Sequence, residues 1–449
     1  MVALAALALV GQGLAADLRA TLSAPELKGA VVSAHAIALD GEELFSSSPD
    51  RPLVPASTMK LFTAVFALET LGAQHRPRTT AWRHRGTVYL QGGGDPGLTV
   101  EELLWLAQVL EVRPEERALF DDSLFGKGRI GPGWEADDLH RGYATQVSPL
   151  TVNGGKATLM ATAGRAWLEP RNFGVRITGT IASGAGEVRF ARDQGSWTLR
   201  VWGRAPEGEV VRVGTISLPD PSLCAARVFH KGATRAGGLE PPRTLVPADS
   251  PGVRYPIGAV GEELVFIQPR TVSELLVNVL QDSDNAYAET LLRLASLQRR
   301  GSGEWSVASK AMEEFARTIG IPAGALRVAD GSGLSRQGRV TAKALTTLLR
   351  FAATQPYFDT LLEALARPGV GTLEKRLNGV TVFAKTGSMS GVSALAGIVR
   401  AADGREVAFA VLMNGMSSTA AARRAQDAFV SRLSLGENDA ARGRAVSGL

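Results

Sequence analysis

Residues 53–72 read LVPASTMKLFTAVFALETLG and place a serine and a lysine at the start of an otherwise apolar helix. Pro55 favours a turn before the helix, and Gly72 favours its end. The apolar residues between them recur at spacings of three and four, as on a buried helix face. Ser57 and Lys60 are therefore predicted to lie one turn apart on the same side. Taken alone, this pair is best explained as an N-cap and a lysine whose stem covers apolar surface.

Two more short motifs follow along the chain. A Ser-Asp-Asn run at 283–285 stands between two predicted helices, and a Lys-Thr-Gly run at 385–387 lies inside a predicted strand. The order Ser-x-x-Lys, Ser-x-Asn, Lys-Thr-Gly is the signature of penicillin-recognising serine enzymes. Each motif is weak alone because such short patterns arise by chance. Together, in this order and in these contexts, the three motifs favour a catalytic role for Ser57 and Lys60 over the explanation as an N-cap and a covering lysine.

The residue types of these motifs suit acyl transfer through a covalent acyl-enzyme. Ser57 is the predicted nucleophile, and a serine hydroxyl needs a base within hydrogen-bond reach. Lys60 can be that base if burial or a neighbouring cation lowers its pKa, and Lys385 is expected to supply the second positive charge. Ser283 is predicted to pass the proton to the leaving amine. The Asn285 amide is predicted to orient the peptide group of the substrate.

The Lys-Thr-Gly strand is predicted to bind the rest of the substrate. Lys385 and Thr386 are expected to bind a carboxylate, while Gly387 leaves room for the substrate to lie against the backbone. The backbone N–H of Ser57, at a helix N-terminus, is the first predicted oxyanion donor, and the N–H of Ser388 is the second.

The spacing of the motifs predicts the domain organisation. The first two motifs are 226 residues apart and the last two 102, so the chain must leave the catalytic domain and return. Between 82 and 261 the pattern changes to short alternating strands and turns. We therefore expect an α+β protein whose catalytic domain, an antiparallel sheet flanked by helices, is formed by 17–81 and 262–436. The β-rich region 82–261 is inserted, as two subdomains.

The two ends of the chain are expected to lie outside these domains. Residues 1–16 resemble a secretion signal, with an apolar run and small residues, although the usual basic start is missing. Residues 437–449 form a polar tail that is expected to be disordered. No other stretch approaches a membrane span. Export to the periplasm or cell envelope, with at most a loose membrane association, is the predicted location.

Composition limits the function classes. The 449 residues carry a net charge of +5, and the excess is spread along the chain, so binding to nucleic acid is not expected. The single cysteine, Cys224, allows no internal disulfide, and the five histidines are scattered. No metal and no cofactor are predicted.

Beyond the three motifs, much of the chain resembles one family. LQGGGDPGLT at 90–99, the stretch PGWEADDLHRGYATQVSPLTVNGG at 132–155 and ADGSGLSRQGRVTA at 329–342 are similar to segments of the D-alanyl-D-alanine carboxypeptidase/endopeptidase family. This family belongs to the low-molecular-mass penicillin-binding proteins of class C, the penicillin-binding protein 4 type. One departure is YATQV at 143–147, where the family has Gly-Ala-Pro-Val after the tyrosine.

This resemblance implies a fold and a function. The fold is a β-lactamase/transpeptidase-like domain with two inserted β-rich domains. The implied activity is a serine-type D-Ala-D-Ala carboxypeptidase or DD-endopeptidase that acts on peptidoglycan stem peptides. β-Lactams are the implied covalent inhibitors. The preference between the two activities and the oligomeric state stay open.

The sequence leaves two alternative functions open and contains three further patterns that require an explanation. A penicillin-recognising sensor without catalysis and a β-lactamase share the three motifs. GKGRIG at 126–131 is followed by Pro-Gly rather than a helix, which argues against a dinucleotide site. EKRLN at 374–378 satisfies a class A β-lactamase pattern, but it leads directly into the Lys-Thr-Gly strand, so Glu374 and Lys375 are expected to be solvated. The sequence assigns no role to the DGSG run at 330–333.

Overall fold

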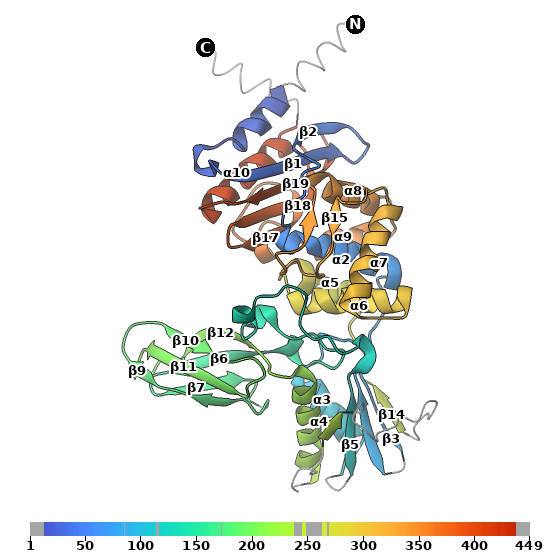
Figure 1. The fold of residues 1–449 in the computed structure, drawn as a ribbon, viewed down its shortest axis with the longest axis vertical. Coiled ribbons are helices and arrows are strands. Elements are labelled where there is room, and N and C mark those ends of the chain that lie inside the picture. Colours follow the sequence, from blue (N-terminus) through green and yellow to red (C-terminus); the bar gives the residue numbers. More distant parts are fainter. Residues whose placement is uncertain are drawn as a thin grey trace. The chain divides into compact units, whose positions relative to one another are not determined.

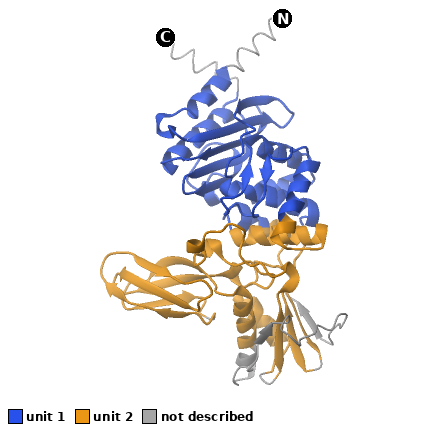
Figure 2. Ribbon diagram, viewed as in Figure 1, with its two compact units in different colours: residues 1–73, 276–284, 309–449 blue, residues 74–275, 285–308 orange. Residues whose placement is uncertain are grey.

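The computed structural model describes residues 13–84, 86–113, 116–171, 173–237, 245–247, 263–266 and 269–436. The chain divides into two compact units, coloured separately in Figure 2. Unit 1 comprises Met1–Ala73, Leu276–Asp284 and Ser309–Leu449, and unit 2 comprises Gln74–Leu275 and Asn285–Ala308. The predicted tail lies outside the described residues, as do the first twelve residues of the predicted leader.

Unit 1 is built on a five-stranded antiparallel sheet in the order β17-β18-β19-β1-β2 (Figure 1). The strands are β1 (Val31–Ala38), β2 (Glu43–Ser47), β17 (Val382–Met389), β18 (Val392–Arg400) and β19 (Glu406–Asn414). Helices contact both faces of this sheet. The α+β class predicted from the sequence is therefore confirmed.

The alternation of side chains along β1 separates the two faces. Ala34 and Ala36 belong to a core cluster that also holds Phe429 of α10 (Thr419–Ser434). His35 points the other way, and its Nδ1 lies 2.7 Å from the hydroxyl of Thr346 on α8 (Ala342–Ala353). Helices α8 and α10 therefore cover opposite faces. The sheet is buried on both sides.

The other elements of unit 1 are mostly helical. Residues 13–21 form a helix whose Leu14 and Leu18 are buried in the cluster that contains Phe429. The remaining elements, including two helices that straddle the unit limits, are η1 (Pro25–Leu27), η2 (Ala56–Thr58), α2 (Met59–Leu71), α5 (Val272–Leu280), α7 (Trp305–Thr318), β15 (Leu326–Arg327), β16 (Arg339–Val340), α9 (Phe358–Ala364) and η7 (Gly371–Leu373).

Unit 2 is rich in strands, as the sequence predicts for the region after residue 82. Its described strands form three sheets with the orders β13-β5-β4-β3-β14, β10-β11-β8 with β9 beside β11, and β12-β6-β7. The strands are β3 (Thr80–His84), β4 (Thr87–Gln91), β5 (Arg117–Asp121), β6 (Lys156–Thr162), β7 (Arg165–Glu169), β8 (Arg176–Thr178), β9 (Ile181–Ser183), β10 (Val188–Ala191), β11 (Thr198–Ala205), β12 (Val211–Ser217), β13 (Leu245–Pro247) and β14 (Glu263–Phe266). One apolar core cluster runs from the first of these sheets into the other two.

The helices of unit 2 pack against these sheets. Thr99 and Glu102 form a capping box at the start of α3, and α3 packs against α4. The helices and short helical turns are α3 (Val100–Val109), η3 (Ser123–Phe125), η4 (Ala136–Asp138), η5 (Gly142–Ala144), η6 (Asn153–Gly155), α4 (Pro221–Gly237) and α6 (Asn285–Arg300). GKGRIG at 126–131 is followed by a turn, so the structure does not provide the helix that a dinucleotide site needs.

The limits of the two units differ from the predicted domain limits, chiefly at α6. This helix was assigned to the catalytic domain, but it packs within unit 2. Its Arg293 is buried and donates from Nε to the Gly303 carbonyl at 2.7 Å and from Nη1 to the Gly128 carbonyl at 2.8 Å. The domain limits at 81 and 262 stay a prediction.

Candidate active site

The first motif forms a hydrogen-bonded pair of side chains. Ser57 lies in the short turn η2, which leads directly into α2, and Lys60 lies in the first turn of that helix. Lys60 is fully buried, and its Nζ donates to Ser57 Oγ at 2.9 Å. The sequence expectation that the two side chains share one side is confirmed. A buried amine at this distance is placed to take the hydroxyl proton.

The DGSG run at 330–333, which the sequence left without a role, holds this lysine in place. Lys60 Nζ also donates to the Ser332 carbonyl at 2.9 Å, and the Thr63 hydroxyl donates to the Gly331 carbonyl at 2.6 Å. The buried Asp330 carboxylate accepts the backbone N–H of Gly333 at 2.8 Å and thereby fixes the loop. These residues orient the predicted base rather than react.

The same loop packs against the turn that carries the nucleophile. Gly333 adopts a φ of 75°, and a Cβ there would lie 1.9 Å from the carbonyl oxygen of Ala56. Ala56 itself has a φ of 46°, a conformation that costs free energy in a residue with a Cβ. Close packing on Gly333 therefore supports a strained backbone next to Ser57.

The third motif lies on β17, at the edge of the sheet. Lys385 is fully buried, and its Nζ donates to the Thr386 carbonyl at 2.9 Å. Burial, and secondly repulsion by the Lys60 ammonium, hold the pKa of Lys385 well below its usual range. Two ammonium groups buried together are unfavourable. The arrangement therefore favours a state in which one of the two lysines is neutral.

Gly387 allows β17 to approach the nucleophile. A Cβ on Gly387 would lie 2.7 Å from the Pro55 carbonyl oxygen and 3.1 Å from the Ser57 backbone nitrogen. The sequence analysis attributed this glycine to space for the substrate. The structure adds a second reason, because the chain itself approaches Gly387 too closely for a side chain, and the role in substrate binding stays a prediction. This close approach places the backbone N–H of Ser57 next to β17. The N–H of Ser388, the second predicted oxyanion donor, belongs to the residue after Gly387 on that strand.

The second motif is divided between the two units. Ser283 stands in the turn between α5 and α6 with a φ of 62°, and it lines the same cavity as Ser57. Among the described residues its hydroxyl makes no hydrogen bond. Asn285 belongs to unit 2, where its Nδ2 donates to the Tyr143 carbonyl at 2.7 Å. The roles of both residues stay predictions.

Five of the predicted residues of unit 1 line a cavity of about 280 Å³, whereas Lys60 and Lys385 are not part of its lining. Four of its residues were missed by the sequence analysis. Its lining consists of Ser57, Ser283, Thr386, Gly387 and Ser388, which were predicted, and Thr372, Arg376, Ser393 and Arg423, which were not.

The missed arginines differ in their surroundings. Arg376 is paired with Asp427 at 2.7 Å, so its charge is largely balanced. The exposed Arg423 makes no ion pair among the described residues. Arg376 lies within EKRLN, whose Glu374 and Lys375 are exposed as predicted. Arg423 lies on α10, far from every motif in sequence, and no local pattern marks it.

The only cysteine is not a competing nucleophile. Cys224 is buried on α4, and burial raises the pKa of its thiol to about 12. A thiol with such a pKa stays protonated at neutral pH and is inert.

The fold and the lysine-supported serine at the edge of an antiparallel sheet define a serine acyl-transfer enzyme of the penicillin-recognising class. Residues 14–435 match the D-Ala-D-Ala carboxypeptidase 3 (S13) family, and the chain belongs to this family. It is thus a serine-type DD-peptidase by family, and the resemblance proposed from the sequence is confirmed.

Individual relatives agree with this assignment. The chain is 33% identical to a D-alanyl-D-alanine carboxypeptidase of an Actinomadura species, over 93% of this chain and 84% of the relative. Among solved structures it is similar to penicillin binding protein 4 (dacB) of Haemophilus influenzae, with a TM-score of 0.77, 21% identity, and coverage of 93% and 99% of the two chains. The same Haemophilus protein complexed with a β-lactam gives a TM-score of 0.71 at 20% identity. The structural similarity supports the fold.

Proposed function

We propose that this chain cleaves peptidoglycan stem peptides after the penultimate D-alanine, through an acyl-enzyme on Ser57, and that β-lactams acylate the same oxygen. The substrate is either the terminal D-Ala-D-Ala bond or the cross-link between D-alanine and the next diamino acid. One observation carries the proposal: the buried Lys60 Nζ lies 2.9 Å from Ser57 Oγ, beside a second buried lysine.

In the acylation step, Ser57 Oγ attacks the carbonyl carbon of the penultimate D-alanine and gives its proton to Lys60. The oxyanion is stabilised by the backbone N–H groups of Ser57 and Ser388. The C–N bond then breaks, and the leaving amine receives the proton through the Ser283 hydroxyl. Water hydrolyses the resulting ester, which releases the peptide carboxylate and restores the serine hydroxyl. Asn285 orients the peptide group of the substrate.

A leaving terminal D-alanine carries a carboxylate, and the cavity is suited to an anion. Thr386 and the cationic Arg423 line this cavity, and Lys385 precedes Thr386 on β17. A charge-assisted hydrogen bond to a carboxylate is stronger than a neutral one. We assign the carboxylate of the leaving residue to this group.

A peptidoglycan substrate places the enzyme outside the cytoplasm. Within the described residues, no helix combines the length and the apolar character needed to cross a membrane. We propose export to the periplasm or cell envelope.

The test compares wild type with Ser57→Ala and with Ser306→Ala, an exposed serine on α7 that serves as a control. Release of D-alanine from a stem pentapeptide and cleavage of a cross-linked dimer are followed by mass spectrometry. A penicillin adduct is mapped to a residue by peptide digestion. Wild type and the control are expected to cleave at least one substrate and to carry the adduct on Ser57.

Other outcomes separate the alternatives. A wild-type chain that takes up penicillin but cleaves neither peptide is a sensor, which contradicts the proposal. Rapid turnover of the penicillin without peptide cleavage indicates a β-lactamase. Activity retained by Ser57→Ala excludes the mechanism.

A further inference from the structure

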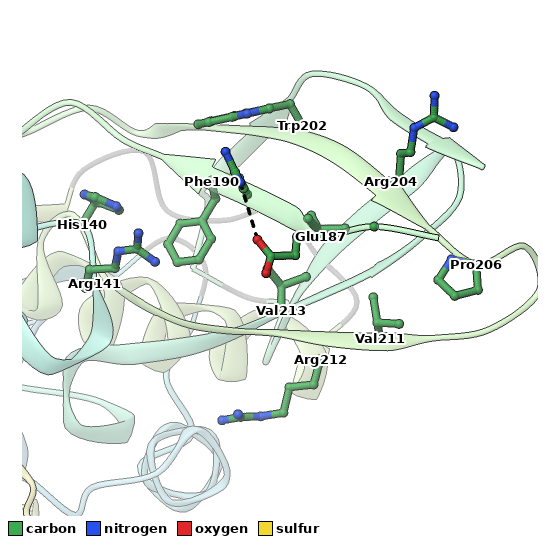
Figure 3. Close-up of a pocket in the computed structure, with 13 residues that line it drawn as sticks. His140, Arg141, Glu187, Phe190, Trp202, Arg204, Pro206, Val211, Arg212 and Val213 are labelled. Carbon is green, nitrogen blue, oxygen red and sulfur yellow. Dashed lines mark ion pairs between the residues drawn. The ribbon is translucent and has the colours of Figure 1, made fainter. Parts of the chain in front are cut away.

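Unit 2 contains a cavity of about 670 Å³ at the opening between two of its small sheets (Figure 3). Its walls are β10 and β12, and each is the edge strand of its sheet in the described part of the chain. Unpaired strand edges expose backbone donors and acceptors that are available to a ligand. None of the residues of the catalytic motifs lines this cavity.

One end of the cavity is closed by a cluster around Phe190. The guanidinium carbon of Arg141 lies 4.8 Å from the ring centroid of Phe190, and the ring of His140 meets it edge-on at 5.6 Å. A β-bridge between Arg141 and Ile216 holds this segment against β12. Figure 3 shows both side chains beside the Phe190 ring. The positive charge at this end is therefore held in a defined position.

Positive charge dominates the lining. Four arginines face one carboxylate, that of Glu187. Glu187 pairs with Arg189 at 3.6 Å, but the two side chains are 80% and 69% exposed. An exposed pair at this distance contributes little and is screened by salt. The cavity therefore keeps a net positive charge. The four arginines are Arg141, Arg189, Arg204 and Arg212.

An exposed tryptophan lies next to these charges. Trp202 is 45% exposed, and it stands directly opposite Arg189 in the pairing of β10 with β11. A large aromatic ring with one face open to solvent offers an apolar platform, and tryptophan is enriched at binding surfaces for this reason. A flat apolar ring beside the Arg189 cation suits a sugar ring that carries an anionic group.

The strand edges themselves are poor templates for a peptide. β10 has only four residues, and the register of β12 shifts between Arg212 and Gly214. Short or bulged edges resist the addition of a further strand. The charge and the aromatic ring, rather than the backbone edges, therefore determine the ligand that fits.

We propose that this arginine groove, defined by Arg141, Arg189, Arg204, Arg212 and Trp202, is a non-catalytic binding site for an anionic cell-wall polysaccharide. The ligand class is a glycan strand whose attached peptides carry carboxylates. This inference rests on the proposed function, because such strands carry the stem peptides that the enzyme cleaves. Phosphodiester polymers of cell walls offer similar charge, and the experiment separates the two.

The experiment measures co-sedimentation with insoluble peptidoglycan in the Ser57→Ala background, so that binding is read without cleavage. The groove variant is Arg189→Ser/Arg212→Ser. The matched control is Arg176→Ser/Arg200→Ser, which removes the same charge from exposed positions on β8 and β11 outside the groove. The groove variant is expected to weaken binding about tenfold, and the control less than twofold, because only the groove arginines contact the anion.

Two further measurements sharpen the result. Trp202→Ser is expected to weaken binding about threefold without reducing its dependence on salt, because its contribution is apolar. Peptidoglycan stripped of phosphodiester polymers by acid is expected to bind as well as untreated walls.

Three outcomes would overturn the proposal. Equal losses in the two double variants would mean that only total charge matters. Loss of binding on removal of the phosphodiester polymers would assign the groove to those polymers. Competition by an extended acidic peptide, but not by soluble glycan fragments, would assign it to a peptide. Failure of the proposed function would be seen separately, in the Ser57 cleavage assay.

Discussion

Both units bury cationic side chains completely, but they surround them differently. In unit 2 the Arg293 guanidinium donates to backbone carbonyls, those of Gly303 at 2.7 Å and Gly128 at 2.8 Å among them. The ring centroids of Trp305 and Phe125 lie 3.9 Å and 4.8 Å from its central carbon. Burial lowers the pKa of Arg293 to about 10, so it stays charged at neutral pH.

In unit 1 the completely buried basic groups among the described residues are two lysines, Lys60 and Lys385. Lys60 repels Lys385, and burial and this repulsion together depress the pKa of Lys385. Several carbonyl acceptors together with two aromatic rings thus keep the Arg293 cation charged and serve structure, whereas the single carbonyl that accepts from Lys385 does not offset its burial. A neighbouring cation lowers the pKa of an amine. The amine can then lose its proton and take part in the reaction. The following substitutions test this difference, from the largest expected effect to the smallest.

Lys60→Met should reduce acylation of Ser57 by penicillin by about 10³-fold or more, because the hydroxyl loses its base. Lys60→Arg should not restore the rate, since a guanidinium does not release its proton at any accessible pH. Stopped-flow acylation rates check both variants. Lys310→Met, at an exposed position, is the control. Rescue by arginine would mean that only positive charge is required, not a base.

Arg293→Met should destabilise unit 2 by about 3–5 kcal/mol, because it removes the donor that several buried carbonyls share. The folded fraction should still be acylated by penicillin at the wild-type rate. Denaturant unfolding followed by tryptophan fluorescence measures the stability, with Arg299→Met, on the exposed end of the same helix, as the control. An unchanged stability would show that Arg293 is not a structural cation.

Lys385→Met should have opposite effects on stability and activity. A lysine with a depressed pKa binds fewer protons in the folded state, so stability is lost as pH falls below the usual value of 10.5. Replacing it should therefore raise the free energy of unfolding at pH 7 by about 1 kcal/mol. Acylation should fall about 100-fold, because the buried pair shares one positive charge and Lys60 alone would keep the proton.

The pH profile provides the decisive readout for this variant. Without the charge of Lys385, Lys60 holds its proton more strongly, so the low-pH limb of the acylation rate should move to higher pH. If the low-pH limb of the acylation rate did not move, Lys385 would not be the group that keeps Lys60 neutral. Penicillin acylation measured from pH 5 to 9 covers the range in which general bases usually titrate.

The sequence predicted the parts of this site that depend on local order. Ser57 and Lys60 pair through helix geometry, and the Lys-Thr-Gly strand is marked by its own alternation. The α+β fold followed from the same patterns. The burial of Lys385 and the role of Asp330 could not be predicted, because both depend on packing between segments that are far apart in the sequence.

The same dependence on packing between distant segments explains why the sequence did not indicate Thr372, Arg376, Ser393 and Arg423 as lining residues of the cavity. Arginine and threonine are common at protein surfaces, and nothing in their local sequence distinguishes Arg423 from Arg424. Only the folded helix α10 shows that the first of them lines the cavity. The predicted limits of the inserted region differ from the limits of the compact units for a related reason. The helical pattern of α6 predicts a helix but not the unit that receives it.

Gly333→Ala tests whether the loop supports the strained turn beside the nucleophile. Its Cβ would collide with the Ala56 carbonyl, so acylation should fall about tenfold to 100-fold as the nucleophile is displaced. Gly324→Ala is a matched control, because Gly324 has a φ of 88° and no atom within 4 Å of the added carbon. Gly324→Ala should lose about 1 kcal/mol of stability from backbone strain, and Gly333→Ala should lose more, because its Cβ also meets the backbone of Ala56. Equal acylation rates would exclude the positioning role of the loop.

Arg423→Gln should have the smallest effect. It is expected to raise KM for a D-Ala-D-Ala peptide about threefold and to leave kcat nearly unchanged, because an exposed ion pair contributes little. Arg424→Gln, one residue further on the same helix and outside the cavity, is the control. The difference should disappear for a peptide with an amidated C-terminus and should shrink at high salt. If Arg423→Gln instead affected the amidated and free peptides equally, its contact would be with another part of the substrate. The carboxylate of the leaving residue would then be bound through β17 alone.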